Sequence, residues 1–131
     1  MSRKSKGINA ERDLIHKFWG CGWAALRVAG SGSMKYPSAD ILATNKLRRL
    51  AIECKTSGDK NKYLTREEIG QLKEFSDLFC AEPWIAVKFD RHDWLFISID
   101  DMKETGSLHL VSLEIAEKKG LLFNELIEKF K

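Results

Sequence analysis

The chain has 131 residues, which is close to the size of one domain and too short for two ordinary cores. Hydrophobic residues make up 44% of it and only two residues are proline, so a disordered chain is excluded. No apolar run reaches membrane-spanning length, and no apolar segment follows the basic start. We therefore expect a single cytoplasmic domain over residues 1–131 that does not bind a membrane.

Positive charge is concentrated in the first half of the chain. Residues 1–66 hold fourteen Lys and Arg against five Asp and Glu, a net +9, whereas residues 67–131 hold eight against fourteen, a net −6. A basic half that faces a polyanion is typical of nucleic-acid-binding proteins. A solvated basic surface explains the charge equally well, so the charge alone does not decide between the two.

The first half reads as one helix followed by three strands. Apolar residues recur at helical spacing over residues 7–19, and Gly20 and Gly22 mark the helix end. Glu11 falls inside this apolar stripe, so the pattern predicts a carboxylate on the inner face. Three strands are predicted at residues 23–29, 39–45 and 49–56. A Gly/Ser loop at 30–38 joins the first two, and a tight turn at 45–47 joins the last two.

The second half begins with a polar loop at 57–63. Thr65 and Glu68 form a capping box that starts a helix reaching about residue 79. The remaining pattern predicts a strand hairpin, one further strand and a terminal helix, at residues 84–89, 94–99, 108–113 and 120–130. This order predicts the α/β class, with a central mixed β-sheet flanked by helices.

The strand at 49–56 contains the stretch LAIECK, in which two charged side chains interrupt an apolar run. Alternation along a strand places Glu53 and Lys55 on one face and Ile52 and Cys54 on the other. Taken alone, such a pair is typical of an edge strand whose polar face meets solvent.

Two other acids change this interpretation. Asp40 begins the preceding strand, and the hairpin brings it close to the strand that carries Glu53. Glu11 on the inner helix face could complete a cluster of three carboxylates, which repel one another unless a cation compensates them. Oxygen ligands suit Mg²⁺, with Mn²⁺ as a substitute, and no Cys or His spacing suits zinc. Lys55 could position an attacking water or stabilise charge on a phosphate.

An acid on the first helix, an Asp after a loop and E-x-K on the next strand together resemble the PD-(D/E)XK nuclease superfamily. At closer range the chain is similar to the archaeal Holliday junction resolvases. The resemblance covers residues 3 to about 99, and the stretches that carry it are RKSKGINAERDLI, ALRVAGSGS, SADI, AIECK, EEIGQLKEF, AVKF and WLFI. It implies a restriction-endonuclease-like nuclease fold. Pro37 lies three residues before Asp40 and not next to it, so the nominal "PD" is absent.

The resemblance also implies an activity: a homodimer that binds a four-way DNA junction and makes paired nicks with a divalent metal, in DNA recombination and repair. Asp40 and Glu53 would be the principal metal ligands, with Glu11 binding directly or through water. The backbone carbonyl of Cys54 would be a further ligand, and Lys55 would be the motif lysine. The loop serine of the family matches either Ser31 or Ser33.

Basic residues supply the expected DNA contacts. Arg12 and Arg27 match family positions that contact DNA or support the site. Further candidates for phosphate contacts are Arg3, Lys4, Lys6, Lys35, Arg48, Arg49, Lys60 and Lys62. All four tryptophans lie in periodic apolar segments, so we expect core or dimer contacts from Trp19, Trp23, Trp84 and Trp94.

The dimer surface is expected on the second helix or on the hairpin at 84–99. A sliding clamp is a conceivable partner, but the terminal segment LLFNELIEKF lacks a clamp-binding motif.

Two alternatives remain. The first is another PD-(D/E)XK nuclease, of restriction or repair type, because the same residues would serve it. The second is a catalytically silent DNA-binding module that keeps only the basic face. The complete set of Glu11, Asp40, Glu53 and Lys55 argues against a silent module, because such a protein would not need uncompensated acids.

Overall fold

The computed structural model describes residues 3–30 and 35–128, with side chains described from Lys6 onward. The chain forms two compact units, each made of two segments. The first comprises Met1–Glu53 and Gln71–Pro83, and the second comprises Cys54–Gly70 and Trp84–Lys131. Strand β3 (Arg49–Ser57) and helix α2 (Arg66–Leu78) contribute residues to both. Within the described ranges, no helix combines the length and apolar character that a membrane crossing requires.

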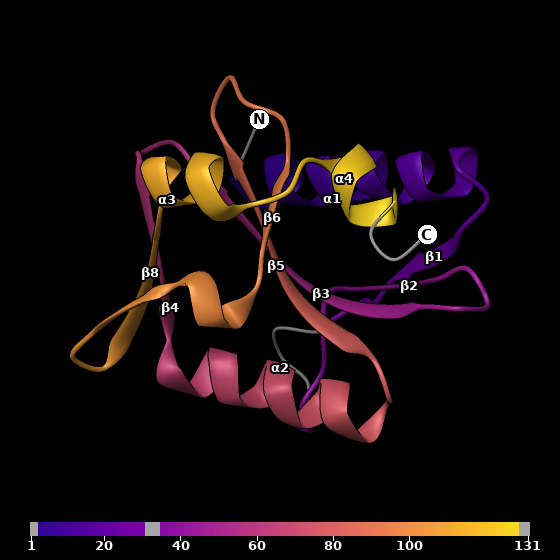
Figure 1. The fold of residues 1–131 in the computed structure, drawn as a ribbon, viewed down its shortest axis with the longest axis horizontal. Coiled ribbons are helices and arrows are strands. Elements are labelled where there is room, and N and C mark those ends of the chain that lie inside the picture. Colours follow the sequence, from indigo (N-terminus) through magenta and orange to yellow (C-terminus); the bar gives the residue numbers. More distant parts are fainter. Residues whose placement is uncertain (1–2, 31–34, 129–131) are drawn as a thin grey trace. The chain divides into compact units, whose positions relative to one another are not determined.

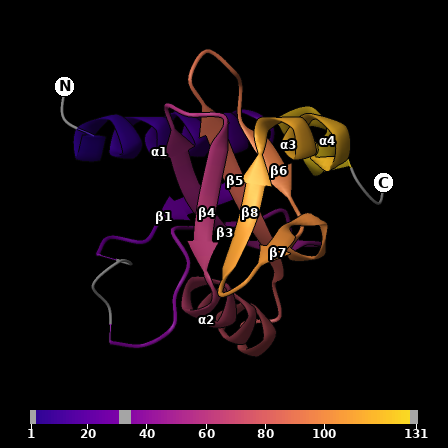
Figure 2. The same ribbon diagram turned by 90° about the vertical axis from the view of Figure 1, so that its left-hand side faces the viewer.

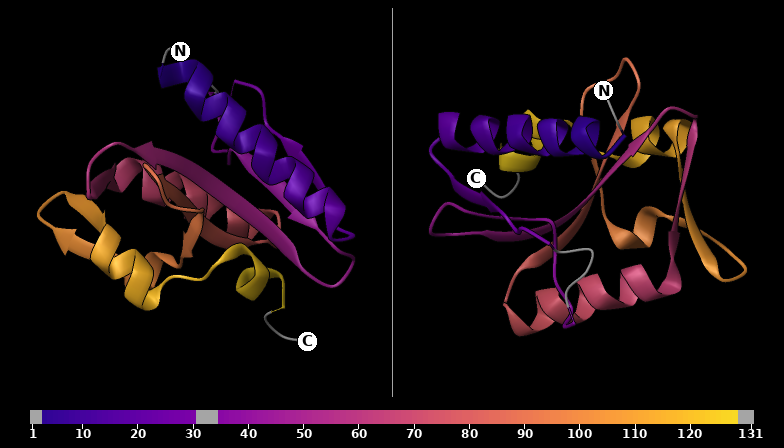
Figure 3. Two further views of the ribbon diagram at one scale, coloured as in Figure 1. Left: turned by 90° about the horizontal axis from the view of Figure 1, so that it is seen from above. Right: turned by 180° about the vertical axis from the view of Figure 1, so that it is seen from behind.

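The first unit places helix α1 (Arg3–Gly20) against antiparallel strands (Figure 1). Strand β1 (Ala24–Arg27) pairs with β2 (Ile41–Thr44), and β2 pairs with β3. Helix α1 packs against β1 and β2, as Figure 3 shows from above. Leu14 and Phe18 are fully buried, and the Phe18 ring lies 5.6 Å from that of Trp23. The apolar stripe of the sequence is thus the packed face of α1.

The turn between β2 and β3 forms at the predicted position. The side-chain oxygen of Asn45 accepts hydrogen bonds from the backbone N–H groups of Leu47 at 3.0 Å and Arg48 at 2.8 Å. Lys46 between them has a φ of 83°, in the left-handed region. An Asn side chain that bonds its own turn in this way stabilises a tight connection and fixes the register of the hairpin.

Two arginines beside this turn make contacts within the first unit. Arg48 donates through Nε and Nη2 to both carboxylate oxygens of Glu82, at 2.8 and 2.9 Å, and lies 5.6 Å from the ring centre of Trp23. Arg49 donates to the Phe79 carbonyl at 3.2 Å and lies 5.8 Å from the Phe79 ring centre. These contacts favour a structural role over the phosphate binding that the sequence suggested.

The second unit contains a three-stranded antiparallel sheet that the sequence predicted only in part (Figure 2). Its order is β4 (Asn61–Thr65), β8 (Leu108–Ser112) and β7 (Lys103–Thr105). Strand β8 confirms the strand expected at 108–113. The prediction of a polar loop at 57–63 was wrong in its second half, because β4 begins at Asn61. Lys and Asn have low strand propensity, and pairing with β8 outweighs it.

The hairpin expected at 84–99 is confirmed. Strand β5 (Glu82–Phe89) pairs antiparallel with β6 (Leu95–Ile97). At the carboxyl end of β5, the Asp90 N–H donates to the Ser57 carbonyl at the end of β3, at 3.0 Å. Because these two ends meet, β3 and β5 run in the same direction. The sheet of order β1-β2-β3-β5-β6 is therefore mixed, and the predicted α/β class is confirmed.

Helix α2 starts with the predicted capping box. The Thr65 N–H donates to Oε1 of Glu68 at 3.0 Å, and the Glu68 N–H donates to Oγ1 of Thr65 at 3.0 Å. Toward the C-terminus the prediction was less accurate. Short 3-10 helix η2 (Ile99–Asp101) and helix α3 (Leu113–Lys119) were not predicted, and α4 (Phe123–Glu128) begins later than the helix expected at 120–130. The last residues of that expected helix lie outside the described residues.

Three of the four tryptophans occupy the core, as expected. Trp23, Trp84 and Trp94 are buried. Trp19 differs, because 59% of it is exposed while its indole N–H donates to the Ala25 carbonyl at 2.9 Å. It is therefore a surface residue at the end of α1.

Candidate active site

Asp40 is held by backbone hydrogen bonds on both sides. Its N–H donates to the Ile52 carbonyl at 2.9 Å, and its carbonyl accepts from the Val28 N–H at 2.8 Å. Asp40 thereby extends β2 by one residue between its two neighbouring strands. The side chain is half-buried. Because the backbone of Asp40 is hydrogen-bonded on both sides, the point from which its side chain projects is fixed, as a metal ligand requires.

Glu11 on α1 faces Asp40. A carboxylate oxygen of Glu11 lies within 4.8 Å of one of Asp40. Burial and then the charge of Asp40 raise the pKa of Glu11, and Arg27 opposes the rise. Nε of Arg27 lies 3.5 Å from Glu11, and only 18% of the Glu11 side chain is exposed. The predicted carboxylate on the inner helix face is thus present beside a second acid.

Arg27 lies beside this pair, and its charge opposes the rise in the pKa of Glu11. Its Nε is buried and has no hydrogen-bond partner within the described part of the chain. The sequence left open whether Arg27 contacts DNA or supports the site. The distance to Glu11 favours support of the site, because a cation at the end of β1 partly offsets two close carboxylates.

Glu53, the third predicted acid, is half-buried on β3 at the end of the first unit. It follows Ile52, whose carbonyl binds Asp40, so the chain brings it next to the residue that anchors Asp40. Among the described residues, its carboxylate does not join Glu11 and Asp40 in a group with all ligand atoms within 4.8 Å of one another. The structure therefore brings together two of the three predicted acids at that distance.

Cys54 and Lys55 open the second unit. Cys54 is half-buried and forms no disulfide with the other described cysteines. Nζ of Lys55 forms an ion pair with Oε2 of Glu68 in the first turn of α2, and 22% of the Lys55 side chain is exposed. The sequence identified Glu68 as a helix cap but not as the partner of Lys55. No signal along the sequence joins the two, because a strand and a loop separate them.

The Lys55 contact affects the ionisation of Glu68. Burial by itself raises the pKa of this carboxyl, but the hydrogen bonds from Lys55 and Thr65 and the charge of Lys55 outweigh it. The net shift of the Glu68 pKa is downward, so Glu68 is a carboxylate at neutral pH.

The predicted DNA-contacting residues are distributed over both units. Lys6 and Arg12 are exposed on α1, and Lys35 is exposed with its Nζ 5.7 Å from the Tyr36 ring centre. In the second unit, Lys60 is exposed and Lys62 is half-buried. Four further predicted site residues have a position or a side chain outside the described part of the structure. They are Arg3, Lys4, Ser31 and Ser33.

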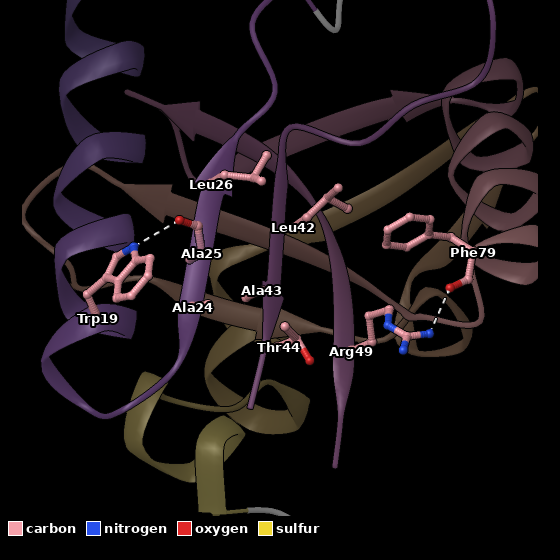
Figure 4. A pocket seen from close by; sticks show the side chains of 9 residues that line it. All are labelled: Trp19, Ala24, Ala25, Leu26, Leu42, Ala43, Thr44, Arg49 and Phe79. Carbon is pink, nitrogen blue, oxygen red and sulfur yellow. Dashed lines mark hydrogen bonds between the residues drawn. The ribbon is translucent and has the colours of Figure 1, made fainter. Parts of the chain in front are cut away.

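The first unit also carries an apolar pocket of about 310 Å³ (Figure 4). Strands β1 and β2 form its floor, Trp19 lies at one side, and Phe79 and Arg49 lie at the other. Leu26 and Leu42 point into it from neighbouring strands. Trp19, Leu26 and Phe79 are 59%, 55% and 42% exposed. Large side chains exposed together on one face are typical of a protein contact.

Chemically, the acid pair suits a hard divalent cation. Two close carboxylates, one of them with a raised pKa, are destabilised by their own repulsion, and a bound cation would remove it. Oxygen ligands with open positions for water are the usual environment of Mg²⁺. The residues present therefore fit a site for a divalent cation.

The chain matches one family model over nearly its whole length. The model describes the archaeal Holliday junction resolvase (hjc) and covers residues 2–131. A crossover junction endodeoxyribonuclease Hjc from Archaeoglobus fulgidus is 40% identical over 129 residues, which is 93% of this chain and 95% of that protein. The protein of the same name from Methanocaldococcus jannaschii is 33% identical over 110 residues, or 84% of this chain and 78% of the relative.

A solved structure agrees with this match. The structure of Archaeoglobus fulgidus Hjc, described as a Holliday junction resolvase from an archaeal hyperthermophile, superposes with a TM-score of 0.86 at 36% identity. The match covers 92% of this chain and 98% of that one. The resemblance and the restriction-endonuclease-like fold expected from the sequence are thus confirmed. The chain belongs to the archaeal Holliday junction resolvase family.

Proposed function

We propose that this protein is a crossover junction endodeoxyribonuclease that resolves four-way DNA junctions by paired, metal-dependent nicks. The observation that carries the proposal is the half-buried pair of Glu11 and Asp40, in a chain whose family match extends over residues 2–131. Relatives that match over most of the chain bear the name of this activity. A role in DNA recombination and repair, in the cytoplasm, follows from the substrate.

Glu11, Asp40, Glu53 and the Cys54 carbonyl would hold Mg²⁺, for which Mn²⁺ could substitute. When bound, the ion supplies a water of lowered pKa and a positive charge beside the scissile phosphate. Lys55 would orient that water or stabilise the charge that builds on the phosphate oxygens. Specificity would come from junction shape and phosphate contacts, made by exposed cations such as Lys6 and Arg12.

Cleavage of a fixed four-way junction tests the proposal. Asp40→Asn and Glu53→Gln should each reduce nicking by at least about a thousandfold, since they remove metal ligands, while junction binding survives. Glu74→Gln on the exposed side of α2 is the matched control and should cut at the wild-type rate. Normal cutting by Asp40→Asn or Glu53→Gln with Mg²⁺ would refute the site assignment.

A panel of DNA substrates separates this function from its alternatives. A restriction or repair nuclease would cut a matched linear duplex or a flap as readily as the junction. A silent DNA-binding module would bind the junction, leave it intact and show no heat of Mg²⁺ binding in calorimetry. The proposed resolvase should nick opposite strands of the junction symmetrically with Mg²⁺ and leave the duplex intact.

We further propose that the protein acts as a homodimer, with all of residues 1–131 forming one nuclease domain. The described residues hold one candidate acidic metal group, and two symmetric nicks need two such groups. The pocket bounded by Trp19, Leu26 and Phe79 is the best described surface for a second copy. It touches the end of α2, one of the two regions that the sequence suggested.

The oligomeric state can be measured by light scattering after gel filtration. Leu26→Lys introduces a charge into the pocket from an exposed position, so it should shift the wild-type dimer toward the monomer. Leu47→Lys is the control, because Leu47 is 91% exposed in the β2–β3 turn and is not among the residues that line the pocket. An unchanged dimer in Leu26→Lys would exclude this surface.

A further inference from the structure

Glu68 binds two different groups with its two carboxylate oxygens. Oε1 accepts a hydrogen bond from the backbone N–H of Thr65 at 3.0 Å, which belongs to the helix cap. Oε2 forms the ion pair with Nζ of Lys55 on β3. Both contacts lie inside the second unit. One planar carboxylate therefore links the start of α2 to the lysine of the E-x-K motif.

The cap restricts the Glu68 side chain before Lys55 is considered. The Glu68 N–H donates back to Oγ1 of Thr65 at 3.0 Å, so the backbone and the side chain of Glu68 are both tied to the same residue. A carboxylate held at one oxygen has few rotamers left for the other. Its second oxygen consequently occupies a fixed position relative to β3.

The Lys55 side chain can adopt many rotamers, whereas its proposed catalytic role requires one orientation of the ammonium group. A lysine side chain carries four rotatable bonds and one point charge, so it selects no direction by itself. Because 22% of its side chain is exposed, water can also form hydrogen bonds to the ammonium group. A fixed carboxylate partner at Nζ removes this freedom, and the lowered pKa of Glu68 keeps that partner charged.

We propose that Glu68 is a positioning residue for the cleavage reaction, which acts by orienting the ammonium group of Lys55 toward the scissile phosphate. This inference rests on the proposed function, in which Lys55 acts in catalysis. It adds a second task to a residue whose sequence context explains it as a helix cap alone. Glu68 itself is not required to touch DNA or metal.

Glu68→Gln separates the two tasks. A glutamine keeps an oxygen for the Thr65 N–H, so the capping box survives, but it loses the charge that holds Lys55. In single-turnover cleavage of a fixed four-way junction with Mg²⁺, Glu68→Gln should be slower by about tenfold to a hundredfold. The Kd for the junction should stay within about twofold of wild type, because Glu68 does not bind the phosphates.

Two control variants exclude a purely structural effect. Thr65→Ala removes the side-chain half of the cap and so costs about 1 kcal/mol of stability, but it leaves the Lys55 contact in place. Glu67→Gln makes the same charge change one residue earlier, at an exposed position. Both should cut within about threefold of wild type at a temperature well below every Tm. Slowing of these controls equal to that of Glu68→Gln would overturn the inference.

A double-mutant cycle tests whether Glu68 acts through Lys55. If it does, Lys55→Ala and the double variant Lys55→Ala/Glu68→Gln should cut equally slowly, because the second change removes nothing further. Additive effects would overturn the inference, as would wild-type cutting by Glu68→Gln. Failure of the proposed function is distinguishable: the wild-type protein would not nick the junction, or Lys55→Ala would cut normally.

Discussion

The carboxylates of Glu11 and Asp40 approach each other within 4.8 Å, although the two residues come from a helix and from the start of a strand. Burial and the charge of Asp40 raise the pKa of Glu11, so the metal-free protein bears an electrostatic cost at neutral pH. Arg27 reduces this cost but does not remove it. Such repulsion is the expected state of a cation site before the cation binds.

Removing one of the two acids should stabilise the metal-free protein. In the presence of a chelator at pH 7, Asp40→Asn should raise the Tm above that of wild type, because the charge of Asp40 then no longer repels the Glu11 carboxylate. Wild type should gain stability as Mg²⁺ is added, by about 2.7 kcal/mol at a hundred times Kd, and Asp40→Asn should gain far less. Thermal unfolding with and without Mg²⁺ measures both. A lower Tm of Asp40→Asn in chelator would contradict the repulsion.

The two shifted glutamates predict opposite pH dependences of stability. The pKa of Glu11 is raised above its ordinary value of 4.5, so its contribution is present below 4.5 and is lost as pH rises through the raised pKa. The pKa of Glu68 is lowered, so its contribution is present above 4.5 and is lost as pH falls through the lowered pKa.

Urea denaturation in chelator, between about pH 3 and pH 7, can resolve these dependences. Relative to Glu11→Gln, wild type should lose stability as pH rises. Relative to Glu68→Gln, wild type should lose stability as pH falls. Two differences of the same sign would show that one of the two electrostatic environments is wrong.

Arg48 should matter for stability more than its position beside a turn suggests. Only 9% of its side chain is exposed, and it donates twice to Glu82 while lying over Trp23. Arg48→Ala should cost about 1–3 kcal/mol in the free energy of unfolding, because Glu82 loses a charged partner. Lys46→Ala at the exposed turn is the control and should change it by less than about 0.5 kcal/mol. Equal effects in denaturant titrations would contradict the structural role of Arg48.

Substitution by alanine should have opposite effects on the free energy of unfolding at two glycines, Gly120 and Gly70. A Cβ at Gly120 would clash with the Ala116 carbonyl oxygen and lie 3.3 Å from that of Phe96, so Gly120→Ala should destabilise by about 1–3 kcal/mol. A Cβ at Gly70, exposed in α2, would meet nothing within 4 Å. Gly70→Ala should therefore stabilise by about 0.5–1 kcal/mol. Thermal unfolding of both variants checks the pair, and a neutral Gly120→Ala would refute the close packing at the end of α3.

The amino-acid sequence alone was sufficient to locate the elements whose signal is local. Helical spacing identified α1 and its buried face, the Asn45 turn joined β2 and β3, and Thr65 with Glu68 located the start of α2. Caps, turns and periodicity act between residues that are close along the chain, so a single sequence displays them. The family resemblance rested on the same local stretches and is confirmed by the match over residues 2–131.

The folded structure was needed to show which residues distant along the chain come into contact. Strand β4 pairs with β8, although the sequence predicted a loop for the first three residues of this strand. Trp19 is exposed although its segment is apolar, and Glu68 meets Lys55 although a strand and a loop separate them. The free energy of such contacts depends on the partner's position, which no periodicity along the chain encodes. The residue types at the proposed site could therefore be identified from the sequence, whereas the pKa shifts of these residues and their contact partners could not.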